Sequence, residues 1–311
     1  KSGASAVKFQ SYKADTLASK NSPSYWDLTK EKTNSQYLLF KKYDQFNVKD
    51  YLTLANYCKK KKIDFMSTPF DNSSVDFLNP LVNTYKVASA DITNFPLLKK
   101  IASKKKPIIL STGASSKKEI NATIKYLNKN GVINKNIILL HCILNYPTQN
   151  VNANLMMIVD LIKSYPKHII GYSDHTLPNE NMTSTTLAYS LGAVVIEKHF
   201  TFNKKLPGND HYHSMDSNDL KEMSKRIEDV RILLGKNKYK KAISSEKIAI
   251  RNARRSIFYN VDLKKGNIIS AKNIIPKRPG NGISPVEFNK IIGKRLKKDI
   301  KEDQQVKWSD F

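Results

Sequence analysis

The sequence has few cysteines and no long apolar run. It contains 2 cysteines in 311 residues, Cys58 and Cys142, without a CxxC spacing. This excludes a disulfide framework and indicates two reduced thiols. No stretch of about 18 apolar residues occurs and no signal-peptide pattern is present, so neither a membrane span nor a secretory leader is expected. The composition therefore predicts a soluble, cytoplasmic protein without a membrane partner.

Arginine is scarce in a strongly basic chain. The 53 basic residues comprise 7 arginines and 46 lysines, and the formal net charge is +26. A basic surface is typical of proteins that bind nucleic-acid phosphates. The lysines, however, fall in runs such as CKKKKID and ASKKKP on expected helix faces, and exposed aromatic residues are not interleaved with them. We interpret them as a solvated surface and expect no nucleic-acid partner. Salt-sensitive retention on nucleic acid would support the alternative, a nucleic-acid-binding module.

Short β-branched runs recur along the first two thirds of the chain. Each ends in small or polar residues and is followed by a helical pattern; the runs are SAVKFQS, IDFMSTPF, TYKVASAD, PIILSTG, IILLHC, HIIGYSDHT and AVVIEKHFT. Runs that are apolar on both faces are typical of a parallel sheet covered by helices. Seven such units in series favour an α/β fold of the (β/α)8 barrel type over an open sheet.

The number of strands, and the change of sequence pattern after the last of them, suggest three segments. A barrel needs an eighth strand, and the opening SGAS resembles the end of a helix, so we expect a first strand to be missing upstream. We predict the barrel over 1–235, closed by a helix with its N-cap at Ser217 and its end at Gly235. A lysine-rich linker follows over 236–255. Short strands with KKG and PGNG turns predict a small β-rich domain over 256–311.

Polar residues close most of the apolar runs. In α/β barrels the reacting groups gather at the carboxyl ends of the strands. This rule selects Lys8, Gln10, Ser67, Thr68, Lys86, Ser89, Asp91, Ser111, Thr112, His141, Asn145, Ser173, Asp174, His175, Glu197 and His199. Histidines and carboxylates could hold a divalent metal, while lysines and hydroxyls could hold a phosphate or carboxylate.

Each of these residue types also has a structural interpretation. A histidine at a strand end can be a hydrogen-bonded core residue, a lysine can extend its ammonium to solvent, and a serine or threonine can cap the next helix. Asp210, His211 and His213 share one polar loop, where a catalytic role and simple solvation are both open.

Nine ordered motifs resemble the sialic acid synthase (N-acetylneuraminate synthase) family along essentially the whole chain. They are VKFQ, STPF, YKVAS, ILSTG, LHC with NYPT, IGYSDHT, EKHFT, PGNDH and KRPGNGISP. The pairing of SDHT with EKHFT, and KRPGNGI, are the specific ones. The resemblance implies a barrel followed by an antifreeze-protein-like domain, arranged as a domain-swapped homodimer.

The resemblance also implies the chemistry. Members condense phosphoenolpyruvate with an N-acylated amino sugar such as N-acetylmannosamine, in its open-chain aldehyde form, and N-acetylmannosamine is the acceptor expected first for this chain. Its 6-phosphate and a 2,4-diacetamido sugar of the legionaminic or pseudaminic type are alternatives. Members of the family use a divalent metal, for which manganese is expected first and magnesium or cobalt are alternatives. A truncated inactive relative and a barrel aldolase with a Schiff-base lysine remain alternatives, and borohydride trapping with pyruvate would reveal the aldolase.

Site residues follow from the matching motif positions. His175 and His199 match the metal ligands. The phosphoenolpyruvate pocket matches Lys8, Thr68, Lys86, Ser89, Ser111, Asn145 and Ser173. The sugar side matches Gln10, Tyr146 and, from the partner subunit, Arg278. Catalytic positions match Asp91, Glu197 and Asp210, although many relatives have glutamate where this chain has Asp91.

Overall fold

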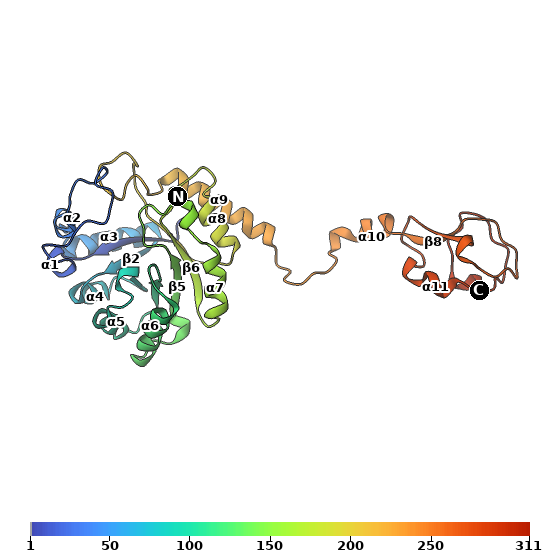
Figure 1. The fold of residues 1–311 in the computed structure, drawn as a ribbon, viewed down its shortest axis with the longest axis horizontal. Coiled ribbons are helices and arrows are strands. Elements are labelled where there is room, and N and C mark those ends of the chain that lie inside the picture. Colours follow the sequence, from blue (N-terminus) through green and yellow to red (C-terminus); the bar gives the residue numbers. More distant parts are fainter. Residues whose placement is uncertain (1) are drawn as a thin grey trace. The chain divides into compact units, whose positions relative to one another are not determined.

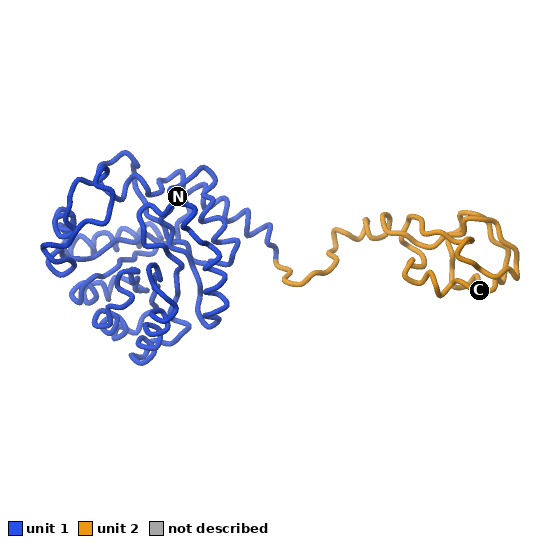
Figure 2. The backbone as a smooth tube through the Cα atoms, in the orientation of Figure 1, with its two compact units in different colours: residues 1–235 blue, residues 236–311 orange. Residues whose placement is uncertain are grey.

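The structure, a computed structural model, describes residues 2–311 and contains two compact units. The first, called here the barrel unit, extends to Gly235, and the second, the C-terminal unit, covers Lys236–Phe311 (Figure 2). Among residues 2–311 no helix is both long and apolar enough to cross a membrane.

Seven parallel strands form the centre of the barrel unit. They are β1 (Ala6–Ser11), β2 (Asp64–Pro69), β3 (Tyr85–Val87), β4 (Ile108–Ser111), β5 (Ile137–Cys142), β6 (Ile169–Asp174) and β7 (Ile196–Lys198). Strand β1 pairs with β2, strands β3 to β7 pair in chain order, and β3 lies beside β2. This curled parallel sheet confirms the predicted α/β fold, and every predicted run supplies one strand.

Helices cover the outside of the strands (Figure 1). They are α1 (Ala14–Leu17), α2 (Gln36–Tyr43), α3 (Val48–Lys61), α4 (Asn72–Leu78), α5 (Phe95–Ala102), α6 (Lys117–Lys129), α7 (Met156–Ser164), α8 (Thr183–Ser190) and α9 (Ser217–Leu234). The core between the two layers is apolar, and Tyr85, Ile108, Leu110, Ile137 and Leu139 are fully buried in it. Burial on both faces of strands such as β5 and β6 explains why these runs lack a polar alternation.

Local capping explains where several helices begin. Helices α3, α6 and α9 each start with a capping box, in which the cap side chain and the third helical residue satisfy each other's backbone amides. For α9 the cap is Asp216, whose carboxylate accepts from the amides of Asn218 and Asp219. The predicted N-cap Ser217 is therefore wrong by one residue, because a carboxylate can also interact favourably with the positive end of the helix.

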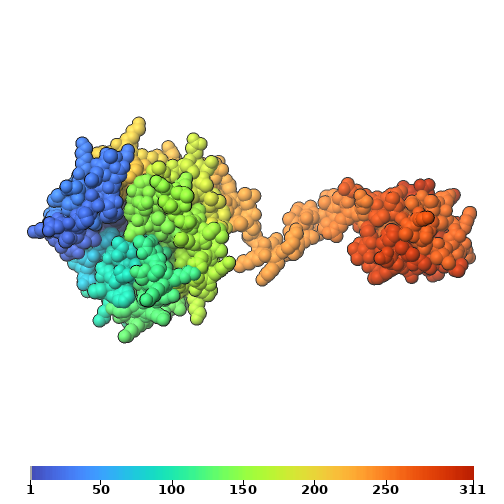
Figure 3. Space-filling model, viewed as in Figure 1, coloured from blue at the N-terminus to red at the C-terminus, as the bar shows by residue number. Residues whose placement is uncertain are grey.

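The C-terminal unit has its own small core. Its antiparallel strands are β8 (Ser256–Tyr259) and β9 (Ile274–Lys277), and α10 (Lys247–Ala253) and α11 (Phe288–Ile291) are its α-helices. The core contains Ile257, Tyr259, Ile269, Ile274, Ile291, Leu296, Ile300 and Val306. Figure 3 shows residues 256–311 as a closely packed body in red and orange. The segment 236–255, predicted as a linker, includes the short helix α10.

Candidate active site

Side chains from five strands form a network around the half-buried carboxylate of Glu197. Glu197 at β7 accepts a hydrogen bond from Ser173 Oγ of β6 at 2.8 Å. Its other neighbours are ammonium groups: Lys86 Nζ of β3 lies 3.6 Å away and Lys8 Nζ of β1 lies 3.9 Å away. Lys86 Nζ also donates to Ser111 Oγ of β4 at 2.8 Å. Predicted residues from β1, β3, β4, β6 and β7 thus form one contact network.

The groups of this network carry charge although they are largely shielded from solvent. Burial by itself raises the pKa of Glu197, but Lys8, Lys86 and the Ser173 hydroxyl outweigh it and lower that pKa to about 2. Burial lowers the pKa of Lys86, and the Glu197 carboxylate opposes this. The Lys86 side chain is 3% exposed, and two ammonium groups face one carboxylate. The site therefore has an excess of positive charge suited to an anion.

Small residues surround this network. Ser89 Oγ accepts from the amide of Gly113 at 3.0 Å. A Cβ at position 113 would lie 2.8 Å from Ser89 Oγ and 3.2 Å from the Cys142 carbonyl, so this close approach requires glycine. Thr68, at the end of β2, is buried, with 2% of its surface exposed.

The two predicted metal ligands come together at the same ends of β6 and β7. The ring centroids of His175 and His199 are 5.4 Å apart and the rings are nearly perpendicular. His175 Nδ1 lies 2.7 Å from the Ile143 carbonyl, so Nδ1 carries the proton and Nε2 keeps its lone pair. Burial, followed by the nearby His199, lowers the pKa of His175 to about 3. His175 is therefore a neutral imidazole near neutral pH.

Tyr146 and the loop after β7 enclose these rings. The Tyr146 ring lies 4.1 Å from that of His175 and 5.7 Å from that of His199. Asp210 Oδ2 is 3.7 Å from His199 Nδ1, and Asp210 Oδ1 is 3.5 Å from His213 Nε2. Partial burial raises the pKa of Asp210, whose side chain is 59% exposed, but the two neighbouring imidazoles lower it overall.

His213 is a site neighbour that sequence reasoning left undecided. Its side chain is 1% exposed, its ring lies 5.4 Å from that of His199, and neither ring nitrogen has a hydrogen-bond partner. The loop returns to β7 because the amide of Met215 donates to the His199 carbonyl at 2.9 Å. In the sequence, the available signal was the position of His213 two residues before the apolar Met215. The return of this loop to β7 is a feature of the tertiary structure.

Other candidates lie apart from these contacts. Asp91 lies in the turn after β3, where its Oδ1 accepts from the side-chain amide of Asn94 at 3.0 Å and burial raises its pKa. Gln10 and Asn145 are exposed. His141, selected by the strand-end rule, contacts the Ala153 carbonyl at 2.9 Å and stacks on Tyr172, which is a structural role. Arg278 is exposed within the C-terminal unit.

The paired histidines fit a divalent metal ion. Imidazole nitrogens bind such ions at about 2.1 Å, so two rings this close can share one. The Ile143 carbonyl orients His175 in the way that outer contacts commonly orient a metal ligand. Within residues 2–311, no group of three or more histidine, cysteine or acidic side chains is arranged to hold a metal. A site here would consist of two protein ligands, with other positions left to water or substrate.

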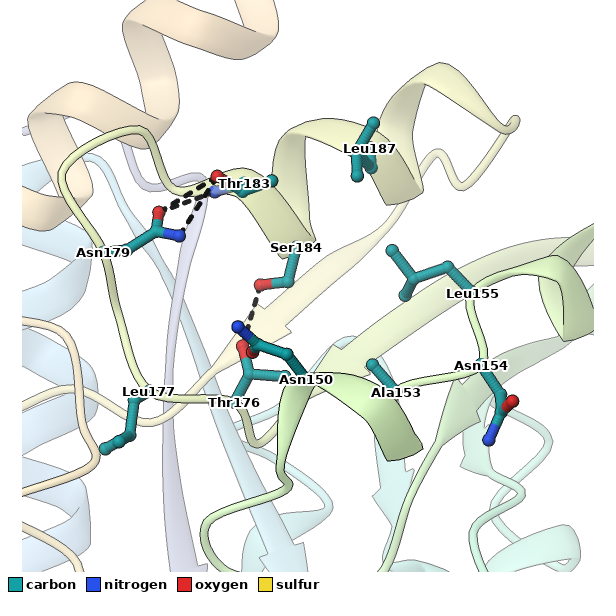
Figure 4. Close-up of a pocket in the computed structure, with 10 residues that line it drawn as sticks. All are labelled: Asn150, Ala153, Asn154, Leu155, Thr176, Leu177, Asn179, Thr183, Ser184 and Leu187. Carbon is teal, nitrogen blue, oxygen red and sulfur yellow. Dashed lines mark hydrogen bonds between the residues drawn. The ribbon is translucent and has the colours of Figure 1, made fainter.

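A surface cavity of about 210 Å³ lies elsewhere, beside the start of α8 (Figure 4). Uncharged residues line it, among them Asn150, Thr176 and Ser184. Without an ionisable side chain it offers no ion pair to an anionic substrate. The polar contacts at the strand ends therefore remain the candidate active site.

Comparison with known proteins shows which family the chain belongs to. The profile of the NeuB family matches residues 1–239, and that of the SAF domain matches residues 254–311. The chain belongs to the NeuB (sialic acid synthase) family. The antifreeze-like SAF domain at its C-terminus was also predicted.

Individual relatives extend over nearly the whole chain. It is 40% identical to the N,N'-diacetyllegionaminic acid synthase of Campylobacter jejuni, over 98% of this chain and 91% of that protein. It is 39% identical to the synthase of the same name from Legionella pneumophila, over 99% and 86%. The solved N-acetylneuraminic acid synthetase of Leptospira borgpetersenii matches with a TM-score of 0.69 and 32% identity, over 79% of each chain. NeuB family membership thus rests on both sequence and fold.

Proposed function

We propose that this NeuB family protein is a transferase that condenses phosphoenolpyruvate with the open-chain aldehyde of an N-acylated amino sugar. The products are a nonulosonic acid and phosphate. The observation that supports this most strongly is that two features are adjacent: the Lys8–Lys86–Glu197 network and the pair of imidazoles of His175 and His199. An anion site beside a candidate metal site is what this reaction requires.

On the phosphoenolpyruvate side, ammonium and hydroxyl groups neutralise and orient the anion. Lys8 and Lys86 supply positive charge, and the predicted hydroxyl and amide donors are Thr68, Ser89, Ser111, Asn145 and Ser173. Glu197 stays ionised at working pH because the two lysines face it. It holds both ammonium groups in position, and such pre-organised charges stabilise developing charge without rearranging.

On the sugar side, His175 and His199 would hold a divalent ion, for which manganese is the first candidate. When bound, such an ion would supply Lewis-acid polarisation of the aldehyde oxygen. Tyr146 and Gln10 flank the acceptor, while Asp210, which faces His199, orients groups around the aldehyde. Carbon 3 of the enol attacks the aldehyde carbon, and water attacks carbon 2 before the C–O bond to phosphate breaks. Of the predicted catalytic carboxylates, Asp91, whose pKa burial raises, is the candidate for proton transfer, whereas Glu197 stays ionised.

The acceptor has two candidates. The family resemblance suggests N-acetylmannosamine. The relatives at 40% and 39% identity are both N,N'-diacetyllegionaminic acid synthases, which favours a 2,4-diacetamido sugar. We rank the diacetamido sugar first for this reason.

The C-terminal unit completes the site in a homodimer under this proposal. Arg278 is exposed and follows the end of β9, so its guanidinium is accessible to a second subunit. A guanidinium can give the N-acyl carbonyl a directional, charge-assisted hydrogen bond.

Phosphate release from phosphoenolpyruvate tests the function. The protein is assayed with N-acetylmannosamine, its 6-phosphate and a 2,4-diacetamido sugar, each with manganese and with a strong chelator. Release that needs both a sugar and manganese is expected. Release that is indifferent to the chelator, or borohydride trapping with pyruvate, would instead indicate a lysine-based aldolase. Absence of release with every acceptor contradicts the proposal.

A further inference from the structure

A fully buried ion pair lies directly beside the two histidines in the sequence. Lys198 Nζ is 2.7 Å from Asp174 Oδ2, and the two side chains are 1% and 0% exposed. Asp174 immediately precedes His175, and Lys198 immediately precedes His199. The two residues are register partners across the β6–β7 pair. The ion pair therefore joins the ends of β6 and β7 immediately before His175 and His199.

The strand alternation separates this pair from the site. Side chains alternate between the two faces of a strand, and Ser173 contacts Glu197 on the face that carries the site. Asp174 and Lys198 consequently lie on the opposite face, toward α8, where Asp174 accepts from Ser184 Oγ at 2.8 Å. A slip of β7 by one residue would exchange the faces and turn Glu197 and His199 out of the site.

Strand β7 is short, and the backbone hydrogen bonds of Val194, Val195 and His199 tie its flanks to β6 and to the returning loop. The strand has three residues, Ile196–Lys198, and β6 is its partner in the sheet. Short strands specify their register weakly unless side chains add to it. The ion pair adds a contact that one particular register alone can make.

The polar groups around the pair are well matched. Asp174 Oδ1 accepts from Tyr172 Oη at 2.9 Å and from the Thr176 amide at 2.8 Å. Lys198 Nζ also donates to the Thr176 carbonyl at 2.6 Å. Thr176 Oγ1 donates to Ser184 Oγ at 2.9 Å, and Figure 4 shows Ser184 pointing from α8 toward Thr176. The network thus joins β6, β7 and α8.

A pair of this kind is better suited to specificity than to stability. Burying two charges costs free energy that their attraction repays only in part, and apolar replacements of such pairs are often neutral. The best-attested use of a buried polar group is to fix register. Because the Asp174–Lys198 pair lies beside His175 and His199, a register that it fixes also fixes the position of the site residues.

We propose that Asp174 and Lys198 are positioning residues that fix β7 against β6 and so direct Glu197 and His199 into the active site. The proposal rests on the proposed function only for the nature of the ion that the histidines bind. It assigns the pair no contact with substrate.

The test compares two variants of the full chain. In the double variant Asp174→Asn/Lys198→Met both charges are removed, so no unpaired charge is left buried. The matched control is Lys106→Met, because Lys106 also donates to two backbone carbonyls, those of Asn79 and Val82, but lies before β4 at the other end of the strands. Thermal unfolding, Mn²⁺ affinity by electron paramagnetic resonance, and hydrogen exchange of segment 194–201 are measured for each.

The double variant is expected to fold, to bind Mn²⁺ about ten- to hundredfold more weakly, and to exchange segment 194–201 at least about tenfold faster. The control should lose thermal stability without either effect. Unchanged exchange and affinity in the folded double variant overturn the proposal, and so do equal effects in the control. If the wild-type protein binds no Mn²⁺, the metal part of the proposed function fails, and hydrogen exchange alone decides the inference.

Ser184→Ala keeps the test open if the double variant does not fold. This change removes one donor to Asp174, and a single hydrogen bond of this kind supports an expected two- to tenfold weakening of Mn²⁺ binding. A folded Ser184→Ala protein with wild-type affinity and exchange overturns the proposal.

Discussion

The two units bury very different side chains. At the strand ends of the barrel unit the buried groups include Lys86, Ser111, Asp174 and His175, whereas the C-terminal unit has an apolar core in which Ser256 and Asp310 are the buried polar residues. Most of its ion pairs are superficial: the lysine of the Lys264–Asp299 pair is 83% exposed and that of Lys277–Asp303 is 37% exposed. The exception is Lys298–Asp310, whose carboxylate is 2% exposed.

This difference suggests that the two units have different roles in the proposed reaction. Buried charges cost free energy unless they are paired, so a cluster of them is expected where function requires it. The C-terminal unit has no such cluster within its described residues, and its contribution to the proposed reaction is one exposed arginine. Changes in the barrel unit should therefore act on catalysis, and most changes in the C-terminal unit on local stability.

The largest effect is expected for the histidines. His175→Ala and His199→Ala should each lower kcat/KM about a thousandfold or more, because the Lewis-acid contribution is worth several kcal/mol. Circular dichroism should remain unchanged, since rim residues contribute little to the core. Wild-type-like turnover in either variant, or turnover in a strong chelator, would contradict the metal assignment.

Removal of the buried ammonium should have the next largest effect. Lys86→Met eliminates a charge-assisted contact worth about 1.5–3 kcal/mol, so kcat/KM for phosphoenolpyruvate should fall about ten- to hundredfold. Glu197 also loses one of its two cations. Steady-state kinetics with Lys106→Met as control checks this; equal losses in both would mean that stability, rather than the site, was affected.

Arg278→Ala tests the exception in the C-terminal unit. It should weaken use of the sugar about tenfold or more, through one charge-assisted hydrogen bond. The KM for phosphoenolpyruvate should change little. Mixing Arg278→Ala with His199→Ala protein should restore part of the activity after subunit exchange, because one site of each mixed dimer is then intact. Absence of recovery in verified mixed dimers, or a monomeric protein, would refute a shared site.

Tyr259→Phe should affect stability alone. Tyr259 Oη donates to Asp310 Oδ2 at 3.2 Å in the core of the C-terminal unit. Loss of this bond should cost about 0.5–1.5 kcal/mol, measured by denaturant unfolding of the full chain. Turnover by the folded protein should stay at the wild-type level; a large kinetic defect would blur the contrast between the units.

The smallest effect concerns pH. The amide of Glu302 donates to Asp262 at 2.7 Å, and this bond, followed by that of Lys301, lowers the pKa of Asp262 below its model-compound value of 3.8. A lowered folded-state pKa stabilises the fold above about pH 4, and this contribution is lost as the pH falls through the folded value. Asp262→Asn should therefore flatten slightly the acid side of the stability profile. An identical profile would show that the exposed contact contributes nothing.

Much of the site could be predicted from the sequence because strands end where apolar runs end. Lys86, Ser111, Ser173 and Glu197 each close or interrupt such a run, and parallel strands bring their carboxyl ends to one edge. The exposed Asn145 and Gln10 follow the same rule without joining the contact network. A strand-end position gives the edge of the sheet but not the direction of the side chain.

The sequence by itself determined the seven strands, the covering helices and the edge at which the polar groups gather, because β-branched runs and capping residues act through local backbone preferences. Only the tertiary structure decided that Lys198 pairs with Asp174, that the loop after β7 brings His213 to His199, and that Lys86 meets Glu197. These contacts join residues distant in the chain. They depend on strand register and on the return path of a loop, which no local pattern specifies.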